Sequence, residues 1–132
     1  MNKWIDKFSA EMFLRLGLGA MYVYSGYDLI VHPTAWFWAR RGLPVFLQQM
    51  IDAAGKTAYL QIQGAGEIVL ALIFLLWFLP RRLVRVAAFL AAVEMAAILI
   101  MVVLDGVTFR DIGLLGAALA LWIMPEKKPV VA

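Results

Sequence analysis

The sequence predicts an all-α protein, an integral membrane four-helix bundle that forms one domain over residues 1–132. Of the 132 residues, 64% are apolar and only 16% are charged, and the mean hydropathy is +0.85. A soluble fold of this size would leave far too much of that apolar surface in water. Four apolar segments account for nearly all of the chain, so any chemistry should take place inside the bundle or on its short loops.

Cysteine content and charge exclude several classes of function. The chain has no cysteine, which excludes thiolate catalysis and iron–sulfur clusters within this polypeptide. Its single histidine is too little for a metal site. The net charge of +3 comes from basic residues at the ends of apolar segments, which indicates membrane orientation and not nucleic-acid binding. A redox role would therefore need a bound cofactor or a partner subunit.

The first span is predicted over residues 9–31. It is polar for a membrane helix, because Glu11, Arg15, Ser25 and Asp28 interrupt its apolar residues. One face of this helix should therefore pack against protein and not against lipid.

One interfacial segment and three further spans complete the predicted bundle. Residues 34–56 combine tryptophan and arginine with an amphipathic stretch too short to cross a bilayer, which is typical of a segment lying in the headgroup zone. The remaining spans are predicted over residues 57–79, 83–104 and 107–124, with Pro80 ending the second. The last contains small residues at a spacing that allows close helix packing: Gly113, Gly116, Ala117 and Ala120.

Lysine and arginine are unevenly distributed between the two sides of this bundle. The side with the termini carries Lys3, Lys7, Arg81, Arg82, Arg85, Lys127 and Lys128, against Arg40, Arg41, Lys56 and Arg110 on the other. The positive-inside rule then predicts that both termini are cytoplasmic. The first apolar stretch is followed by three more and has no small-residue cleavage site, so it is expected to be a retained helix and not a signal peptide.

Glu67 and Glu94 are the leading candidates for chemistry, since each lies near the middle of a predicted span. The helical rise places both at a depth of about 15 Å. Two acids at equal depth in a low-dielectric bundle should not both ionise, so one would hold a proton or find a cation. Such a pair could relay protons or exchange them with a quinone-like ligand. Alternatively, both carboxyls are neutral and only hydrogen-bond across a helix interface.

Arg15, Tyr22 and Tyr24 could complete such a site. The Arg15 guanidinium can form a bidentate pair with either midspan carboxylate. An i,i+4 pair with Glu11 or snorkelling to the lipid headgroups are the alternatives. The tyrosine hydroxyls could hold a quinone oxygen, although tyrosines near a membrane surface are most often belt anchors. Tyr22 lies deep enough to need a partner.

Four polar residues, Asp28, His32, Arg110 and Asp111, are predicted to meet near the outer rim. A cluster of acid, imidazole and arginine could bind an anion or admit protons, and ordinary rim ion pairs would have the same pattern. Residues 64–66 (GAG) follow no strand and lack a third glycine, so they predict close helix packing and not a nucleotide site.

Four short motifs occur in a distinctive order along the chain: residues 14–19 (LRLGLG), 24–26 (YSG), 64–67 (GAGE) and 108–121 (TFRDIGLLGAALAL). Each is weak alone, but their order and spacing together are fairly specific. They resemble the DoxX-like family of small four-helix membrane proteins, and the resemblance covers most of the chain.

This resemblance implies an inner-membrane protein of a bacterium or archaeon. The namesake proteins are small membrane subunits of a thiosulfate:quinone oxidoreductase, which implies a quinone-interacting or anchoring subunit of a membrane redox system. Arg15 and Glu67 match charged positions of the first two helices of the family, and Arg110 and Asp111 match the start of the fourth. Many members carry a lysine where this chain has Asp28, so an anion-binding role of that position is not carried over.

The leading hypothesis is a subunit in which Glu67 and Glu94 manage protons, Arg15 fixes their ionisation and Tyr22 contacts a quinone. The sequence does not decide whether such a subunit is itself catalytic. The alternatives are a proton-coupled carrier of a small solute, a lipid-modifying enzyme and a structural partner-binding subunit. A carrier of this length would need a homo-oligomer.

Overall fold

The computed structural model describes residues 9–101 and 110–125, and all regular structure in these ranges is helical. The elements are α1 (Ala10–Val31), the 3₁₀ helix η2 (Pro33–Gly42), α2 (Val45–Ala54), α3 (Lys56–Leu75), α4 (Arg81–Met101) and α5 (Asp111–Ile123). The prediction of an all-α protein is confirmed.

Two of these helices, α3 and α4, are long and apolar enough to cross a membrane. Helix α1 has the length as well, with 22 residues, but it carries Glu11, Arg15 and Asp28. Helix α5 is shorter, with 13 residues. The fold thus supports a helical membrane protein, whereas a bundle that crosses the bilayer four times stays a prediction.

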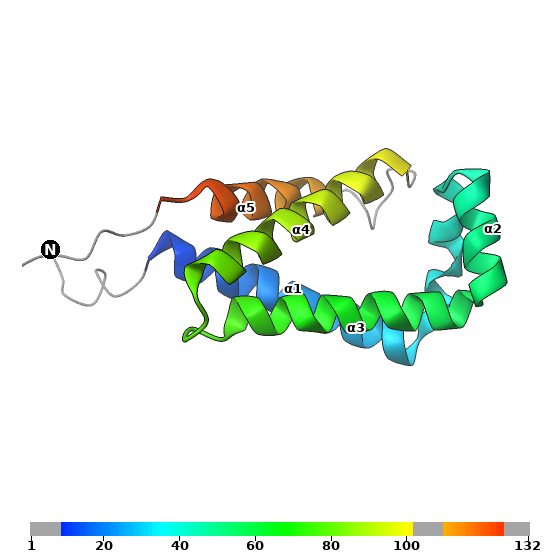
Figure 1. Cartoon of the computed structure of the whole chain (residues 1–132), viewed down its shortest axis with the longest axis horizontal. Coiled ribbons are helices and arrows are strands. Elements are labelled where there is room, and N and C mark those ends of the chain that lie inside the picture. Colours follow the sequence, from blue (N-terminus) through cyan, green and yellow to red (C-terminus); the bar gives the residue numbers. More distant parts are fainter. Residues whose placement is uncertain (1–8, 102–109, 126–132) are drawn as a thin grey trace, which may run out of the picture.

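The four longer helices form two pairs. Helix α1 packs along α3 and helix α4 packs along α5, whereas contacts between the two pairs are sparse. Figure 1 shows the α1 and α3 pair lying along one side of the molecule, the α4 and α5 pair along the other, and α2 standing across the far end of α3. The core between the pairs is built from apolar side chains of all four helices.

Helices α1 and α3 come very close at two glycines. A Cβ atom on Gly26 would lie 2.7 Å from the backbone oxygen of Gly64, and one on Gly64 would lie 2.7 Å from the backbone oxygen of Gly26. Real Cβ atoms do not approach this closely, so only glycine fits here. The prediction of close packing is therefore confirmed at Gly64, but a Cβ on Gly66 would meet nothing within 4 Å.

The contact between α4 and α5 does not use the glycines predicted for it. A Cβ on Gly113 or Gly116 would meet nothing within 4 Å, so the prediction that these two glycines allow close helix packing is wrong for the described fold. Helix α5 buries Ala118 and Leu121 instead. Helix α4 contributes four small residues to the shared core: Ala87, Ala88, Ala91 and Ala92.

The connection between α3 and α4 differs from its prediction at both helix ends. Helix α3 ends at Leu75 and not at Leu79, and α4 begins at Arg81 and not at Leu83. Pro80 precedes α4, and its carbonyl accepts a hydrogen bond from the backbone N–H of Leu83. The side chain of Arg15 caps this end of α3, as described below.

The predicted interfacial segment forms η2 and α2, each with 10 residues. Both are too short to cross a bilayer, as expected. Gly55 joins α2 to α3 with a φ of 95°, a backbone conformation that favours glycine.

Several predicted features fall outside the described residues. These are residues 102–104 of the third span, residues 107–109 of the fourth, which include the start of the last family motif, and the basic residues of both termini: Lys3, Lys7, Lys127 and Lys128.

Candidate functional site

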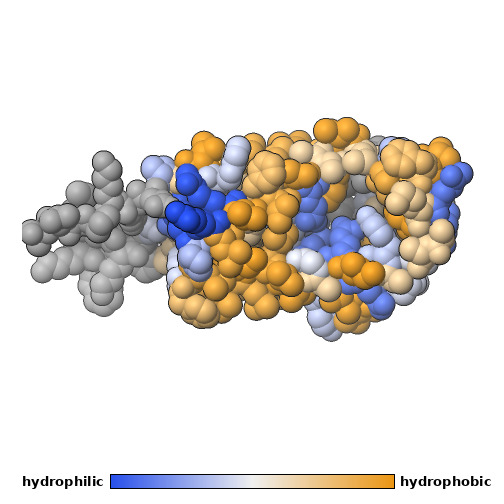
Figure 2. Space-filling view, viewed as in Figure 1, coloured by the Kyte–Doolittle hydropathy of each residue, from blue (hydrophilic) through white to orange (hydrophobic). Residues whose placement is uncertain are grey.

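A cavity of about 1160 Å³ lies where the two helix pairs meet η2 and α2. Every described helix contributes to its wall, which is mostly apolar and rich in aromatic rings. Small-molecule sites usually have volumes of roughly 300–1,000 Å³ and combine an apolar wall with a few polar groups. In Figure 2, hydrophilic residues gather around the hollow beside the α2 end of a largely apolar surface.

Glu67 of α3 and Glu94 of α4 lie beside each other on the wall of this cavity. The hydroxyl of Tyr22 donates a hydrogen bond to Oε2 of Glu94 at 3.4 Å. The side-chain amide of Gln63 donates to Oε1 of Glu67, also at 3.4 Å. Each carboxyl group therefore has one oxygen that accepts a hydrogen bond from the protein.

The second oxygen of each carboxyl does not accept such a hydrogen bond. Oε2 of Glu67 and Oε1 of Glu94 are buried and have no hydrogen-bond partner among the described residues. A buried polar atom left in this way costs about 1–3 kcal/mol. Two adjacent buried carboxyls also cannot both ionise without strong repulsion. The arrangement suits a pair that shares a proton, or a pair that binds a polar ligand atom in the cavity.

Tyr22 reaches this pair from the core and not from the cavity. Its side chain is 0% exposed and its ring stacks on Phe74 with the centroids 6.2 Å apart. Tyr22 is not part of the cavity wall, so the predicted contact between Tyr22 and a ligand is replaced by a hydrogen bond to Glu94. Its role in this geometry is to orient that carboxyl.

Tyr24, Arg110 and Asp111 line the same cavity as the carboxyl pair. The structure therefore brings these predicted site residues together around one space, although they come from opposite ends of the sequence. Helix α1 contributes Tyr24, and the start of α5 contributes Arg110 and Asp111.

The other half of the predicted rim cluster forms a separate set of contacts. Nδ1 of His32 lies 3.2 Å from Oδ1 of Asp28, and the indole N–H of Trp36 donates to Oδ2 of Asp28 at 2.7 Å. Asp28 therefore connects α1 to η2. Because Trp36 lies on the cavity wall, this hydrogen bond also holds an aromatic side chain of the wall in position.

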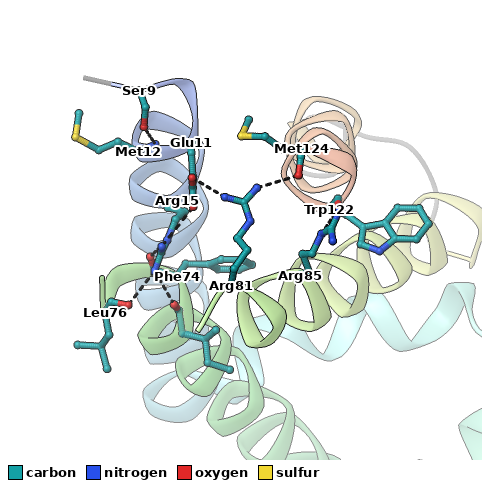
Figure 3. Close-up of polar contacts among 11 residues, drawn as sticks. Ser9, Glu11, Met12, Arg15, Phe74, Leu76, Arg81, Arg85, Trp122 and Met124 are labelled. Atoms are coloured by element: carbon teal, nitrogen blue, oxygen red, sulfur yellow. Dashed lines mark hydrogen bonds and ion pairs between the residues drawn. The ribbon is translucent and has the colours of Figure 1, made fainter. Parts of the chain in front are cut away.

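Arg15 lies at the opposite end of the bundle from the cavity, at the C-terminus of α3 (Figure 3). Its Nε donates to the backbone oxygen of Phe74 at 2.8 Å, and its Nη2 donates to those of Leu76 at 2.8 Å and Ile73 at 3.3 Å. The carbonyls of Ile73 and Phe74 have no partner inside a helix that ends here, and a cation is favourable at this terminus. The carbonyl of Leu76 also accepts from the backbone N–H of Leu79 at 3.4 Å. Arg15 thus caps α3, which ends at Leu75.

The predicted pairing of Arg15 with a midspan carboxylate does not occur. Its acidic partner is Glu11, one turn earlier on α1, at 3.6 Å. Glu11 also forms an ion pair with Arg81 of α4, and Arg81 donates to the backbone oxygen of Met124 at 3.1 Å. Arg85 binds the end of α5 in the same way, donating to the backbone oxygen of Trp122 at 3.2 Å. We call Glu11, Arg15, Arg81 and Arg85 the arginine cluster.

The aromatic residues of η2 belong to the site although they were interpreted only as membrane anchors. Trp36, Phe37 and Trp38 line the cavity, the two indoles stack with centroids 6.2 Å apart, and the ammonium of Lys56 lies 5.7 Å from the ring centroid of Phe37. Three aromatic residues in a row within a non-spanning segment were the available signal, but the same pattern is typical of belt anchors.

Comparisons with known proteins do not identify a family for this chain. No protein-family model, curated protein or solved structure matches it. The resemblance to DoxX-like proteins therefore stays a prediction from the four motifs quoted above.

Proposed function

We propose that this protein is a DoxX-like membrane four-helix bundle whose cavity binds a quinone, as the quinone-interacting or anchoring subunit of a membrane redox system. One observation carries the proposal: Glu67 and Glu94 each present an unpartnered buried oxygen, among the described residues, beside a large apolar cavity. A quinone has a flat apolar ring and two carbonyl oxygens, and these match the aromatic wall and a protonated carboxyl of this site.

The residues of the site have distinct roles in this proposal. Glu67 and Glu94 hold a proton between them and donate it to a ligand oxygen, while Tyr22 keeps Glu94 in position from the core. Tyr24, Arg110 and Asp111 complete the polar part of the wall. A bound quinone supplies two-electron, two-proton redox chemistry, with its electrons exchanged with a redox partner subunit. Arg15 is outside this site and stabilises the fold.

The proposed placement is in the inner membrane of a bacterium or archaeon. Helices α1, α3, α4 and α5 would cross the bilayer with both termini in the cytoplasm and the cavity in the outer half. Large apolar side chains on the outside of α3 and α4 support burial in lipid, since Ile62 is 72% and Ile100 83% exposed. The expected partners are the bilayer, a redox subunit and a second copy of the chain, and not nucleic acid.

The proposal is tested by extracting small molecules from gently purified full-length protein and identifying them by mass spectrometry. We expect a quinone in stoichiometric amount in the wild type and a loss of most of it in Glu67→Gln, because the amide would donate to the unpartnered oxygen of Glu94 and leave no shared proton for the quinone oxygen. Asp52→Asn makes the same chemical change on α2, away from the cavity wall, and should retain the quinone.

Two results would count against a quinone site. A wild-type protein that is empty, and that also fails to bind added quinone, points to a scaffold or a carrier. Solute flux driven by a pH gradient in proteoliposomes would then identify the carrier. Equal quinone content in wild type and Glu67→Gln would show that the carboxyl pair is not the binding group.

A further inference from the structure

A second hollow reaches the carboxyl pair from the outer face of the bundle. It is a groove of about 450 Å³ between α3 and α4. Helix α3 packs mainly on α1 and helix α4 mainly on α5, so these two consecutive helices contact each other only sparsely. The groove is the space left between the two pairs.

The walls of this groove are apolar and open to the outside. They are formed by Val69, Leu70 and Ile73 of α3 and by Leu83, Val86 and Leu90 of α4. Val69, Val86 and Leu90 are each more than half exposed, at 55%, 56% and 51%. In a membrane-spanning bundle these side chains face lipid tails, so an apolar chain can lie along them, and the polar side chains of the groove are those of Gln63, Glu67 and Glu94.

The groove and the large cavity share three lining residues: Gln63, Glu67 and Glu94. The carboxyl pair thus stands at the junction of an aromatic cavity and a narrow apolar channel. An amphiphile with a flat polar head and a long hydrocarbon tail requires such an arrangement, with the head in the cavity and the tail in the channel. Gly66 lies at the edge of the groove, where a Cβ would meet nothing within 4 Å, and it leaves the passage free of a side chain.

We propose that the groove between α3 and α4 holds the hydrocarbon tail of the ligand whose head lies against Glu67 and Glu94. This inference rests on the proposed function and deepens it: the substrate class is a long-tailed quinone that enters and leaves laterally from the bilayer, and not a soluble short-chain one. The groove and the cavity are continuous at the carboxyl pair, since Glu67 and Glu94 line both spaces, so a head bound in the cavity leaves its tail at the mouth of the groove.

The test compares two probes on full-length protein in detergent: a benzoquinone with a long alkyl chain and the same head without the chain. Binding is followed by quenching of the tryptophan fluorescence of the cavity wall. Gly66→Leu places a side chain in the groove. We expect it to weaken binding of the chain-bearing quinone by about five-fold or more, since overpacking typically costs at least that factor, and to leave the head alone bound as before.

Gly17→Leu is the matched control. Gly17 is also a helical glycine whose Cβ would meet nothing within 4 Å, but it lies on α1 and away from the groove. It should change the binding of neither probe, which removes any general effect of a larger side chain on a lipid-facing helix.

A photoreactive group at the end of the alkyl chain provides a second measurement that needs no substitution. Crosslinks to α3 and α4 at the groove would support the inference, whereas crosslinks confined to η2 and α2 would overturn it and place the tail in the large cavity. Equal affinity of Gly66→Leu and wild type for the chain-bearing quinone would overturn it as well, and an accompanying change in oligomeric state would assign the groove to a second copy. If wild type binds neither probe, the proposed function fails together with this inference.

Discussion

Buried charged residues at the two ends of the bundle differ in how many of their polar atoms have hydrogen-bond partners. At one end, Arg15 is 4% exposed and donates to three backbone carbonyls and contacts Glu11. At the other, Glu67 is also 4% exposed, but one oxygen of each carboxyl in the pair has no partner among the described residues. The hydrogen bonds of Arg15 stabilise the fold, although Nε of Arg81 in the same cluster is buried without a partner among the described residues. A buried acid with bonds left unmade beside a cavity is available for a ligand.

The largest effect is expected from breaking the arginine cluster. Arg15→Met removes the cap of α3 and leaves the carbonyls of Ile73 and Phe74 without their side-chain donor, which should lower the free energy of unfolding by about 3–5 kcal/mol. Unfolding of the purified protein in mixed micelles measures this. Arg82→Met, at an exposed position next to Arg81, is the control and should stay within about 0.5 kcal/mol of wild type. Similar losses in both variants would contradict the capping role.

The second effect concerns the crossing of α1 and α3. Gly26→Val adds a branched side chain where a single Cβ would already lie 2.7 Å from the backbone oxygen of Gly64, so the two helices must separate. We expect a loss of about 2–3 kcal/mol in the same unfolding experiment. Gly17→Val, where nothing lies within 4 Å of the added Cβ, should cost about 0.5–1 kcal/mol or less from helix propensity. Equal losses would show that the crossing tolerates separation.

The third prediction contrasts the two ends through one chemical change. Glu94→Gln supplies an amide donor beside the unpartnered oxygen of Glu67, and should raise the free energy of unfolding by about 1 kcal/mol. Glu11→Gln removes a charge that binds two arginines and should lower it by about 1–2 kcal/mol. Unfolding curves of the two variants should therefore shift in opposite directions, and a shift in the same direction would refute the contrast.

The smallest effect is expected from Tyr22→Phe. This change removes one long hydrogen bond to Glu94, 3.4 Å in length, and keeps the stacking on Phe74. Stability should fall by less than about 1 kcal/mol, whereas affinity for a headgroup quinone should fall several-fold because Glu94 loses its orientation. An affinity equal to wild type would show that Tyr22 serves packing alone.

The sequence predicted the elements of the fold better than their contacts. Apolar runs and charges predicted four long helices and a helical segment too short to span, because hydrophobic length and proline positions are local properties. The glycines of α5 were assigned to a close helix contact, but a Cβ on Gly113 or Gly116 would meet nothing within 4 Å. Spacing shows that small residues share a face, but not which neighbour that face meets.

For the site, the residue types were identified correctly as unusual, and their grouping depended on the fold. Acids at Glu67 and Glu94 are conspicuous in apolar helices whatever their neighbours are, and so is Arg15. The sequence could not predict which residues these side chains contact. The rotation of each helix about its axis decides whether a side chain meets a carboxyl or a helix end.

The sequence by itself determined an all-helical chain with apolar helices and a few costly buried charges, because composition and periodicity suffice for that conclusion. Only the tertiary structure decided that Arg15 caps α3, that Glu67 and Glu94 lie together, and that a cavity and a groove meet at them. These features arise from the pairing of α1 with α3 and of α4 with α5. The crossing of α1 and α3 leaves no room for a Cβ at Gly26 or Gly64, and α4 buries four alanines in the core. The periodicity of the sequence does not show which helix packs against these small residues.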